Sequence, residues 1–134
     1  MPAPLSRKAT AGQLVQVFGT EDSPASRAAL RFFRERRIAP QFIDLRRKPI
    51  AAGELRRFVE RLGARTLVDE AGRPWRDAGL AYLRMDDAEL SSRLLADQRL
   101  LRLPLVRIGS GCAAGRDEAA WKRLLAEASA GERA

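Results

Sequence analysis

The sequence predicts an α/β domain: a mixed four-stranded sheet with flanking helices and a helical insertion before the third strand. Three patterns support this prediction. A strand–helix–strand start over residues 13–47 requires a parallel strand pair joined by a right-handed crossover. The turn Gly-Ser-Gly at 109–111 lies between two short apolar runs and makes the last pair antiparallel. An amphipathic pattern at 117–129 predicts a closing helix.

The first part of the chain alternates between β-rich and helical patterns. Residues 13–19 form a compact β-rich run. Ser23 then stands as the N-cap of a helix, with Pro24 at its first position, and this helix is expected to end near Ile38. Residues 40–47 follow as a second strand, because apolar and polar side chains alternate there.

The middle of the chain is helical but interrupted. Residues 49–63 form an amphipathic helix that stops at a glycine. Residues 64–80 are too broken for one long element. Residues 86–101 are helical again, opened by Asp86 or Asp87.

The last part contains the hairpin. Residues 103–109 form the third strand, a short return strand surrounds Cys112, and 117–129 form the last helix, with acidic residues in its first turn. The resulting order, β-α-β-α-α-β-β-α, is thioredoxin-like. In that fold the proline that opens the third strand faces the N-terminus of the first helix and is often cis. A cis bond between Leu103 and Pro104 is therefore a hypothesis, and the sequence alone leaves cis and trans open.

Length and composition favour one domain. The 134 residues suffice for one core and are few for two. We place the domain at 12–130, with the insertion at about 64–101 and a disordered lead at 1–11. No apolar run is long enough to span a membrane, and the N-terminus lacks the apolar core of a secretory signal. With one cysteine and hence no intrachain disulfide, these features predict a cytoplasmic protein.

Two absences exclude most familiar enzyme classes. The chain has no histidine, which removes Ser–His and Cys–His catalysis and the commonest metal ligand. Its single cysteine excludes a CxxC dithiol and a zinc site built on several thiolates. We therefore predict no metal site and no obligatory cofactor.

The net charge of +8 comes from 25 lysines and arginines against 17 acidic residues. Such a charge is compatible with a nucleic-acid partner. An arginine-rich solvated surface explains it more simply, because no basic run is interleaved with aromatic residues. Direct nucleic-acid binding is therefore not the interpretation we favour.

Several segments, in order, resemble one family. They are the Ser-x-x-Ser-Arg loop at 23–27, the helix LRRFVERLG at 55–63, the segment TLVDEAGRPWRDAGL at 66–80 and the run LPLVRIGSGCAAGRDEAAWKRLL at 103–125. Together they resemble the glutaredoxin-type arsenate reductase (ArsC)/Spx family, over about residues 13–129. The resemblance implies a thioredoxin-like fold.

The resemblance also implies a cysteine at the start of the first helix, whose thiolate attacks an arsenic oxyanion or a disulfide. Here that position is Ser23, and the CxxC partner of redox-active relatives is Ser26. A serine hydroxyl is a weak nucleophile without a base and cannot form disulfides. The site has therefore lost its sulfur.

Most arginines of the family site are also absent or displaced. The family arginine before the strand proline corresponds to Leu103, and Arg102, one place earlier, is expected to point to the other face. A mid-chain arginine is missing around Val68, and only Arg116 matches the family well.

Ser23 is thus expected to act as a helix cap. The N–H groups of Ala25 and Ser26 can still hold a small anion or a glutathione carboxylate, with Arg27 and Arg116 as supporting cations. Arg27 also fits an ordinary solvated helix position.

Four further residues have alternative interpretations. Cys112 fits a buried, inert residue better than a relocated redox thiol, because the return strand runs away from the first helix N-terminus. Trp75 and Trp121 fit the core. The strand segment before Pro104 offers an edge that can pair with an extended peptide.

The interpretation we favour is a non-catalytic binding or regulatory protein of this family. The relatives include a regulator that binds RNA polymerase, so the resemblance implies a protein partner in transcription as one candidate. The alternative is a glutathione-linked oxidoreductase that uses Ser23 to orient a ligand thiolate, or Cys112 as its thiol.

Overall fold

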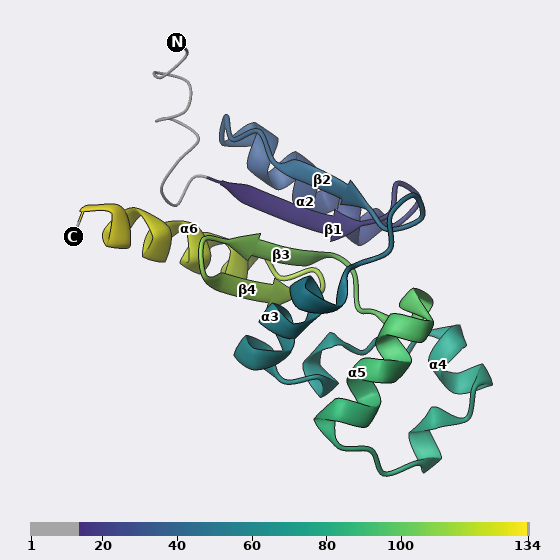
Figure 1. Ribbon diagram of the computed structural model, residues 1–134. Coiled ribbons are helices and arrows are strands. Elements are labelled where there is room, and N and C mark those ends of the chain that lie inside the picture. The colour runs from purple at the N-terminus through teal and green to yellow at the C-terminus, as the bar shows by residue number, and fades with distance from the viewer. Residues whose placement is uncertain (1–13, 134) are drawn as a thin grey trace.

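Figure 1 shows the computed structural model, which describes residues 14–133, with side chains as far as residue 130. Within that range one sheet has its four strands in the order β2-β1-β3-β4. The strands are β1 (Val15–Gly19), β2 (Gln41–Asp44), β3 (Leu105–Ile108) and β4 (Gly111–Ala114). β1 pairs parallel with β2 and antiparallel with β3, and β3 and β4 form an antiparallel hairpin. The predicted mixed sheet is confirmed, whereas the predicted lead at 1–11 lies outside the described residues.

Helices pack on both faces of this sheet. They are α2 (Pro24–Glu35), α3 (Ala52–Leu62), α4 (Arg73–Asp77), α5 (Asp87–Ala96) and α6 (Glu118–Arg133). Single 3₁₀ turns connect them at η2 (Arg65–Leu67), η3 (Leu80–Tyr82) and η4 (Gln98–Leu100). α2 and α6 contribute to the core on one face, and α3 and the helices of the insertion contribute to the core on the other (Figure 1).

Alternating side chains of β1 divide the interior into these two cores. Val17 belongs to the core with Phe32 of α2 and Trp121 of α6, whose rings meet edge to face at 5.2 Å. Phe18 points to the other face, where its ring meets Phe58 of α3 at 5.6 Å. Burying a side chain of this size contributes about 1.5–3 kcal/mol. The predicted packing role of Trp121 is confirmed.

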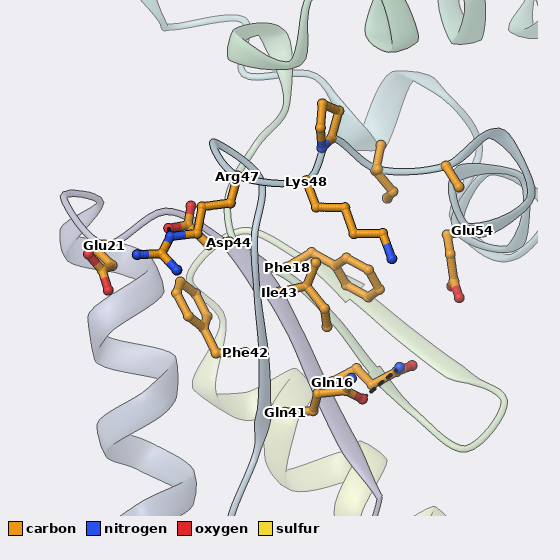
Figure 2. A pocket seen from close by; sticks show the side chains of 13 residues that line it. Gln16, Phe18, Glu21, Gln41, Phe42, Ile43, Asp44, Arg47, Lys48 and Glu54 are labelled. Atoms are coloured by element: carbon orange, nitrogen blue, oxygen red, sulfur yellow. Dashed lines mark hydrogen bonds and ion pairs between the residues drawn. The ribbon is translucent and has the colours of Figure 1, made fainter.

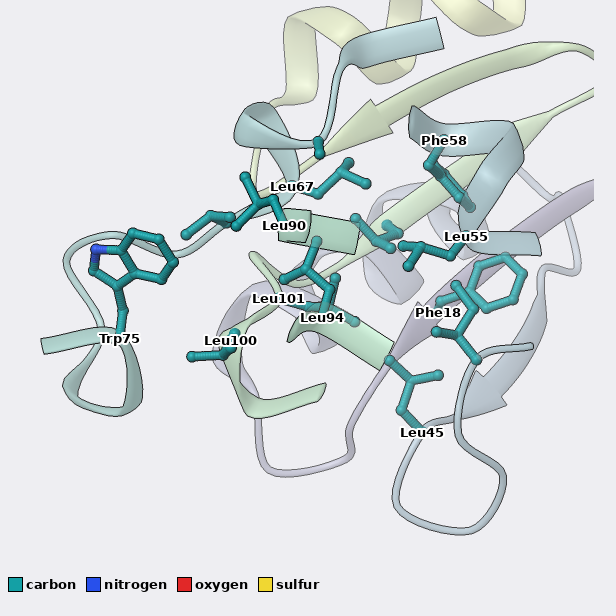
Figure 3. Close-up of a cluster of buried hydrophobic side chains, with 14 of the residues drawn as sticks. Phe18, Leu45, Leu55, Phe58, Leu67, Trp75, Leu90, Leu94, Leu100 and Leu101 are labelled. Atoms are coloured by element: carbon teal, nitrogen blue, oxygen red, sulfur yellow. The ribbon is translucent and has the colours of Figure 1, made fainter. Parts of the chain in front are cut away.

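The insertion packs into the core on the α3 face of the sheet. Figure 3 shows Trp75 at one end of this core and Leu55 and Phe58 of α3 at the other, with leucines from α5 and the segment before β3 between them. Trp75 is 2% exposed, which confirms its predicted place in the core. The insertion also joins the strand segment before β3 through an antiparallel bridge between Val68 and Leu101.

The two predicted helix starts are confirmed. Ser23 caps α2 and Pro24 occupies its first turn. Asp86 rather than Asp87 opens α5, in a capping box. The Glu89 N–H donates to the Asp86 carboxylate at 2.8 Å, and the Asp86 N–H donates to the Glu89 carboxylate at 3.1 Å.

Three helices are shorter than predicted: α3 begins at Ala52 rather than at residue 49, and two others end early. α2 ends at Glu35 because Arg37 adopts a positive φ of 62°, which turns the chain so that the Ile38 N–H donates to the Phe33 oxygen at 3.0 Å. The predicted helix at 86–101 is interrupted at Asp97, whose side chain accepts from the Arg99 N–H and caps η4. Neither change could be read from the apolar pattern, which continues through both breaks.

Strand boundaries also differ from the prediction. β2 ends at Asp44, because its carboxylate accepts from the Arg46 N–H at 3.0 Å and forms a turn. β3 begins at Leu105, just after Pro104, and the bond between Leu103 and Pro104, which the sequence left open, is cis. Among the described helices, none combines the length and apolar character needed to cross a bilayer.

Candidate functional site

The junction between β1 and α2 is the site that the sequence singled out. The Ser23 N–H donates to the Thr20 oxygen at 3.2 Å and closes a turn. The Ser23 Oγ accepts from the Ser26 N–H at 3.1 Å. Ser23 is therefore the N-cap of α2, and its oxygen serves the helix backbone, a role that contributes about 1 kcal/mol to stability.

Ser26 lies behind this cap and is fully buried. Its Oγ accepts from the Thr20 N–H at 3.4 Å. Its own N–H donates to Ser23, so this N–H is not free to bind an anion, in contrast to the expectation from the sequence. Of the two predicted anion-binding N–H groups, only that of Ala25 has no hydrogen bond within the described residues.

Both positively and negatively charged side chains surround the junction. Arg27 donates from Nη1 to the Glu21 oxygen at 2.9 Å and is thereby held over the loop. Asp22 forms an ion pair with Arg46, which the sequence did not indicate. A hydrogen bond from the Thr20 side chain and the charge of Arg46 lower the pKa of Asp22. The carboxylate of Asp22 thus lies next to the N-terminus of α2 and weakens the attraction of this N-terminus for anions.

Pro104 and Arg116 lie at the same end of the sheet. Phe18 pairs with Leu105, which places Pro104 next to the end of β1. The Pro104 oxygen accepts from the Gly115 N–H at 2.9 Å, and Arg116 follows directly. The structure therefore brings together three segments that the sequence linked only by resemblance.

Arg102 belongs to this corner as well. A Cβ atom at Gly115 would lie 2.6 Å from the Arg102 Cδ, so the alkyl stem of Arg102 covers a glycine whose φ is +82°. The sequence predicted only that Arg102 would point to the other face of its strand. The contact with the residue before Arg116 depends on the backbone turn at Gly115, which the sequence indicates only as one more glycine.

The edge before Pro104 is not free for a peptide. The Arg102 N–H donates to the Leu67 oxygen at 2.7 Å, and the Asp69 N–H donates to the Leu100 oxygen at 2.9 Å. The insertion of the chain itself takes the place that we expected an extended peptide to occupy. That expectation was wrong because the sequence does not show where the insertion returns to the sheet.

Cys112 lies away from the junction. It pairs with Arg107 in the sheet and packs in the core on the α3 face, whereas α2 contributes to the core on the opposite face. It is 6% exposed, and its Sγ contacts the Arg57 oxygen at 4.0 Å. Burial raises the pKa of the Cys112 thiol, and the guanidinium of Arg107 offsets only part of this effect.

A groove that the sequence did not predict lies between β2 and α3 (Figure 2). Its volume is about 640 Å³. Gln16 and Gln41 form its floor and share a hydrogen bond of 3.1 Å, beside Phe18 and Ile43. The sequence indicates this groove only through the alternation of polar and apolar residues in β2, which predicts a strand that is partly exposed. Acidic and basic side chains both line the groove, so its charge indicates no single ligand class.

Comparisons with known proteins identify the family of the chain. The model of the ArsC family matches residues 6–124. The chain belongs to the ArsC family. A search of curated proteins gives no match.

Solved structures agree with the ArsC fold at low sequence identity. The YFFB protein is 21% identical with a TM-score of 0.76, and the match covers 83% of this chain and 98% of that one. Arsenate reductase from Vibrio cholerae is 21% identical with a TM-score of 0.71, covering 81% and 95%. An ArsC-related protein from Brucella melitensis is 19% identical with a TM-score of 0.63, covering 82% and 92%. These similarities establish the thioredoxin-like architecture of the family.

Proposed function

We propose that this ArsC-family chain is a binding or regulatory protein that has lost the redox thiol of its relatives. The observation that carries the proposal is the hydrogen bond from the Ser26 N–H to the Ser23 Oγ. Ser23 stands where the family resemblance implies a cysteine, and its oxygen is used as a helix cap. The reactive position has become a structural one.

No neighbouring group supports Ser23 as a nucleophile. A serine attacks only when a base accepts its proton, and the chain contains no histidine. Asp22 is the adjacent carboxylate, but its lowered pKa and its ion pair with Arg46 make it a poor proton acceptor. Catalysis by Ser23 is therefore not supported.

Cys112 is an unfavourable replacement for the missing thiol. Disulfide chemistry requires an accessible thiolate. Cys112 is buried, its pKa is raised, and it faces the core opposite to α2. These features favour the binding function over the glutathione-linked oxidoreductase that we considered as the alternative.

Asp22 weakens the attraction for anions, but its charge is paired with Arg46, so the surface that remains at the junction still offers groups for a partner with an anionic group. It offers the Ala25 N–H, Arg27 and Arg116, beside Pro104. Candidate ligands are the carboxylate of glutathione or an acidic residue of a protein partner. By the family resemblance, a component of the transcription machinery is one such partner.

A turnover assay tests the loss of redox function. The purified protein is incubated with arsenate, reduced glutathione and glutaredoxin, and with a model mixed disulfide. We expect no turnover above the protein-free rate, and the same result for Cys112→Ser. Turnover that disappears in Cys112→Ser would contradict the proposal and favour the enzymatic alternative. The Ser23→Cys variant is the matched control, because it returns a thiol to the capping position.

A binding assay tests the junction surface separately. Proteins that the wild type retains from a cell extract at physiological salt are compared with those retained by an Arg27→Gln/Arg116→Gln variant. Retention should be lost in this variant and kept in Arg84→Gln/Lys122→Gln, which removes the same charge from exposed positions elsewhere. Equal retention by both variants would remove the junction from the proposal.

A further inference from the structure

A second hollow lies on the α3 face of the sheet, at the turn between β3 and β4. Its volume is about 340 Å³. Arg57, Glu60 and Arg61 of α3, Arg107 of β3, Ser110 of the turn and Cys112 of β4 line it. It is distinct from the α2 junction, because Arg107 and Cys112 pair two positions along the hairpin from Leu105 and Ala114.

Three guanidinium groups meet at this hollow. Arg57 and Arg61 are one helical turn apart on α3, a spacing at which like charges repel. Arg107 approaches from the sheet beneath them. Within the described residues neither Arg57 nor Arg61 forms an ion pair, and Arg107 reaches the Glu54 carboxylate only at 3.7 Å. Glu60 is the one acidic residue among the lining side chains, so positive charge is in excess.

Neutral groups also orient two of these arginines, of which Arg107 alone has an acidic partner, Glu54, within the described residues. Arg61 donates from Nε to the Ser110 oxygen at 2.9 Å. Arg107 donates from Nη1 to the Gly109 oxygen at 3.3 Å and from Nη2 to the Gln16 side chain. The Arg107 Nε is buried and has no hydrogen-bond partner in the described part of the chain. Such held guanidinium groups are pre-organised for an oxyanion.

We propose that this pocket binds the phosphate group of a small molecule. A tetrahedral oxyanion accepts several hydrogen bonds at once, which suits donors that converge from α3 and from the sheet. The volume of the pocket exceeds that of a phosphate ion and leaves room for a small organic group attached to the phosphate. A bound anion would also relieve the repulsion between Arg57 and Arg61. This site is independent of the binding function proposed for the α2 junction.

Calorimetric titration of the full chain with inorganic phosphate tests the proposal, with ionic strength held constant by sodium chloride. We expect saturable binding by the wild type. An Arg57→Gln/Arg61→Gln variant should bind about tenfold more weakly or worse, because it loses charge-assisted hydrogen bonds. The matched control is Arg56→Gln, the exposed neighbour of Arg57 that does not line the pocket, and its affinity should equal that of the wild type.

Thermal unfolding provides a second readout. Phosphate should raise the unfolding temperature of the wild type and of Arg56→Gln. The rise should be smaller in Arg57→Gln, which keeps the Arg61 bond to Ser110 and guards against a folding defect in the double variant. Glycerol phosphate is titrated next, and tighter binding than that of inorganic phosphate supports an organic ligand. Absent phosphate binding, or equal weakening in Arg56→Gln, overturns the proposal.

Discussion

A Cβ atom added at Gly19 would lie 2.2 Å from the Oγ of Ser26. The last residue of β1 is thus a glycine because the buried serine of α2 packs directly against its backbone. This contact sets how closely α2 approaches the sheet at the junction between β1 and α2, and substitutions of the two residues can test it.

Gly19→Ala should destabilise the fold by about 1–3 kcal/mol, the usual cost of overpacking. Urea denaturation measures the change. Adding Ser26→Ala should restore only part of the loss, because the new Cβ would still lie 2.8 Å from the Cβ of residue 26. Additive effects of the two substitutions would contradict the contact.

Ser23→Ala should lower the free energy of unfolding by about 1 kcal/mol, since the Ser26 N–H loses its acceptor. Ser23→Asp should retain most of the stability, because aspartate caps equally well. Ser92→Ala, at an exposed position within α5, is the control and should be nearly neutral. A neutral Ser23→Ala would show that the cap contributes little.

Asp97→Asn should show a pH-dependent loss of stability. A hydrogen bond from the Arg99 side chain lowers the pKa of Asp97 in the folded protein. The charged carboxylate therefore contributes to the free energy of unfolding at pH values above its pKa in the unfolded protein, which is about 4. This contribution is lost as the pH falls through the pKa of Asp97 in the folded protein.

The unfolding midpoint in urea, measured at several pH values, checks this sign. The wild type should exceed Asp97→Asn at neutral pH, and the difference should vanish in acid. Glu35→Gln, which removes a carboxylate that forms no ion pair within the described residues, should not reproduce this pattern. A difference between the wild type and Asp97→Asn that grows at acidic pH would contradict a lowered pKa of Asp97.

Trp75→Ala should destabilise the protein by about 3–5 kcal/mol, because it empties a large site in the core of the insertion. Tyr82→Ala is the matched control in the same segment, since Tyr82 is 91% exposed. Thermal unfolding followed by circular dichroism separates the two. Equal effects would mean that the insertion does not pack as described.

The sequence predicted the features that depend on local chemistry. The cap at Ser23 and the start at Asp86 follow from residue types at fixed offsets. The parallel strand pair and the antiparallel hairpin follow from a βαβ start and the Gly-Ser-Gly turn.

Prediction from the sequence failed where contacts between residues far apart in the chain determine the structure. Ser26 is a polar residue near an exposed turn, and only the approach of Gly19 shows that it is buried. The end of α2 depends on the positive φ of Arg37, which residue type does not indicate. The grouping of Arg57 and Arg61 around Arg107 requires the packing of α3 on the hairpin, which no linear spacing encodes.

The bridge between Val68 and Leu101 has a consequence for how this chain can vary. It fastens the two stems of a long excursion to each other, so the intervening residues begin and end at nearly the same place. Loop-closure entropy depends only weakly on length once the ends are joined. The segment between Val68 and Leu101 can therefore be lengthened or trimmed at little entropic cost while the strands beneath it keep their register.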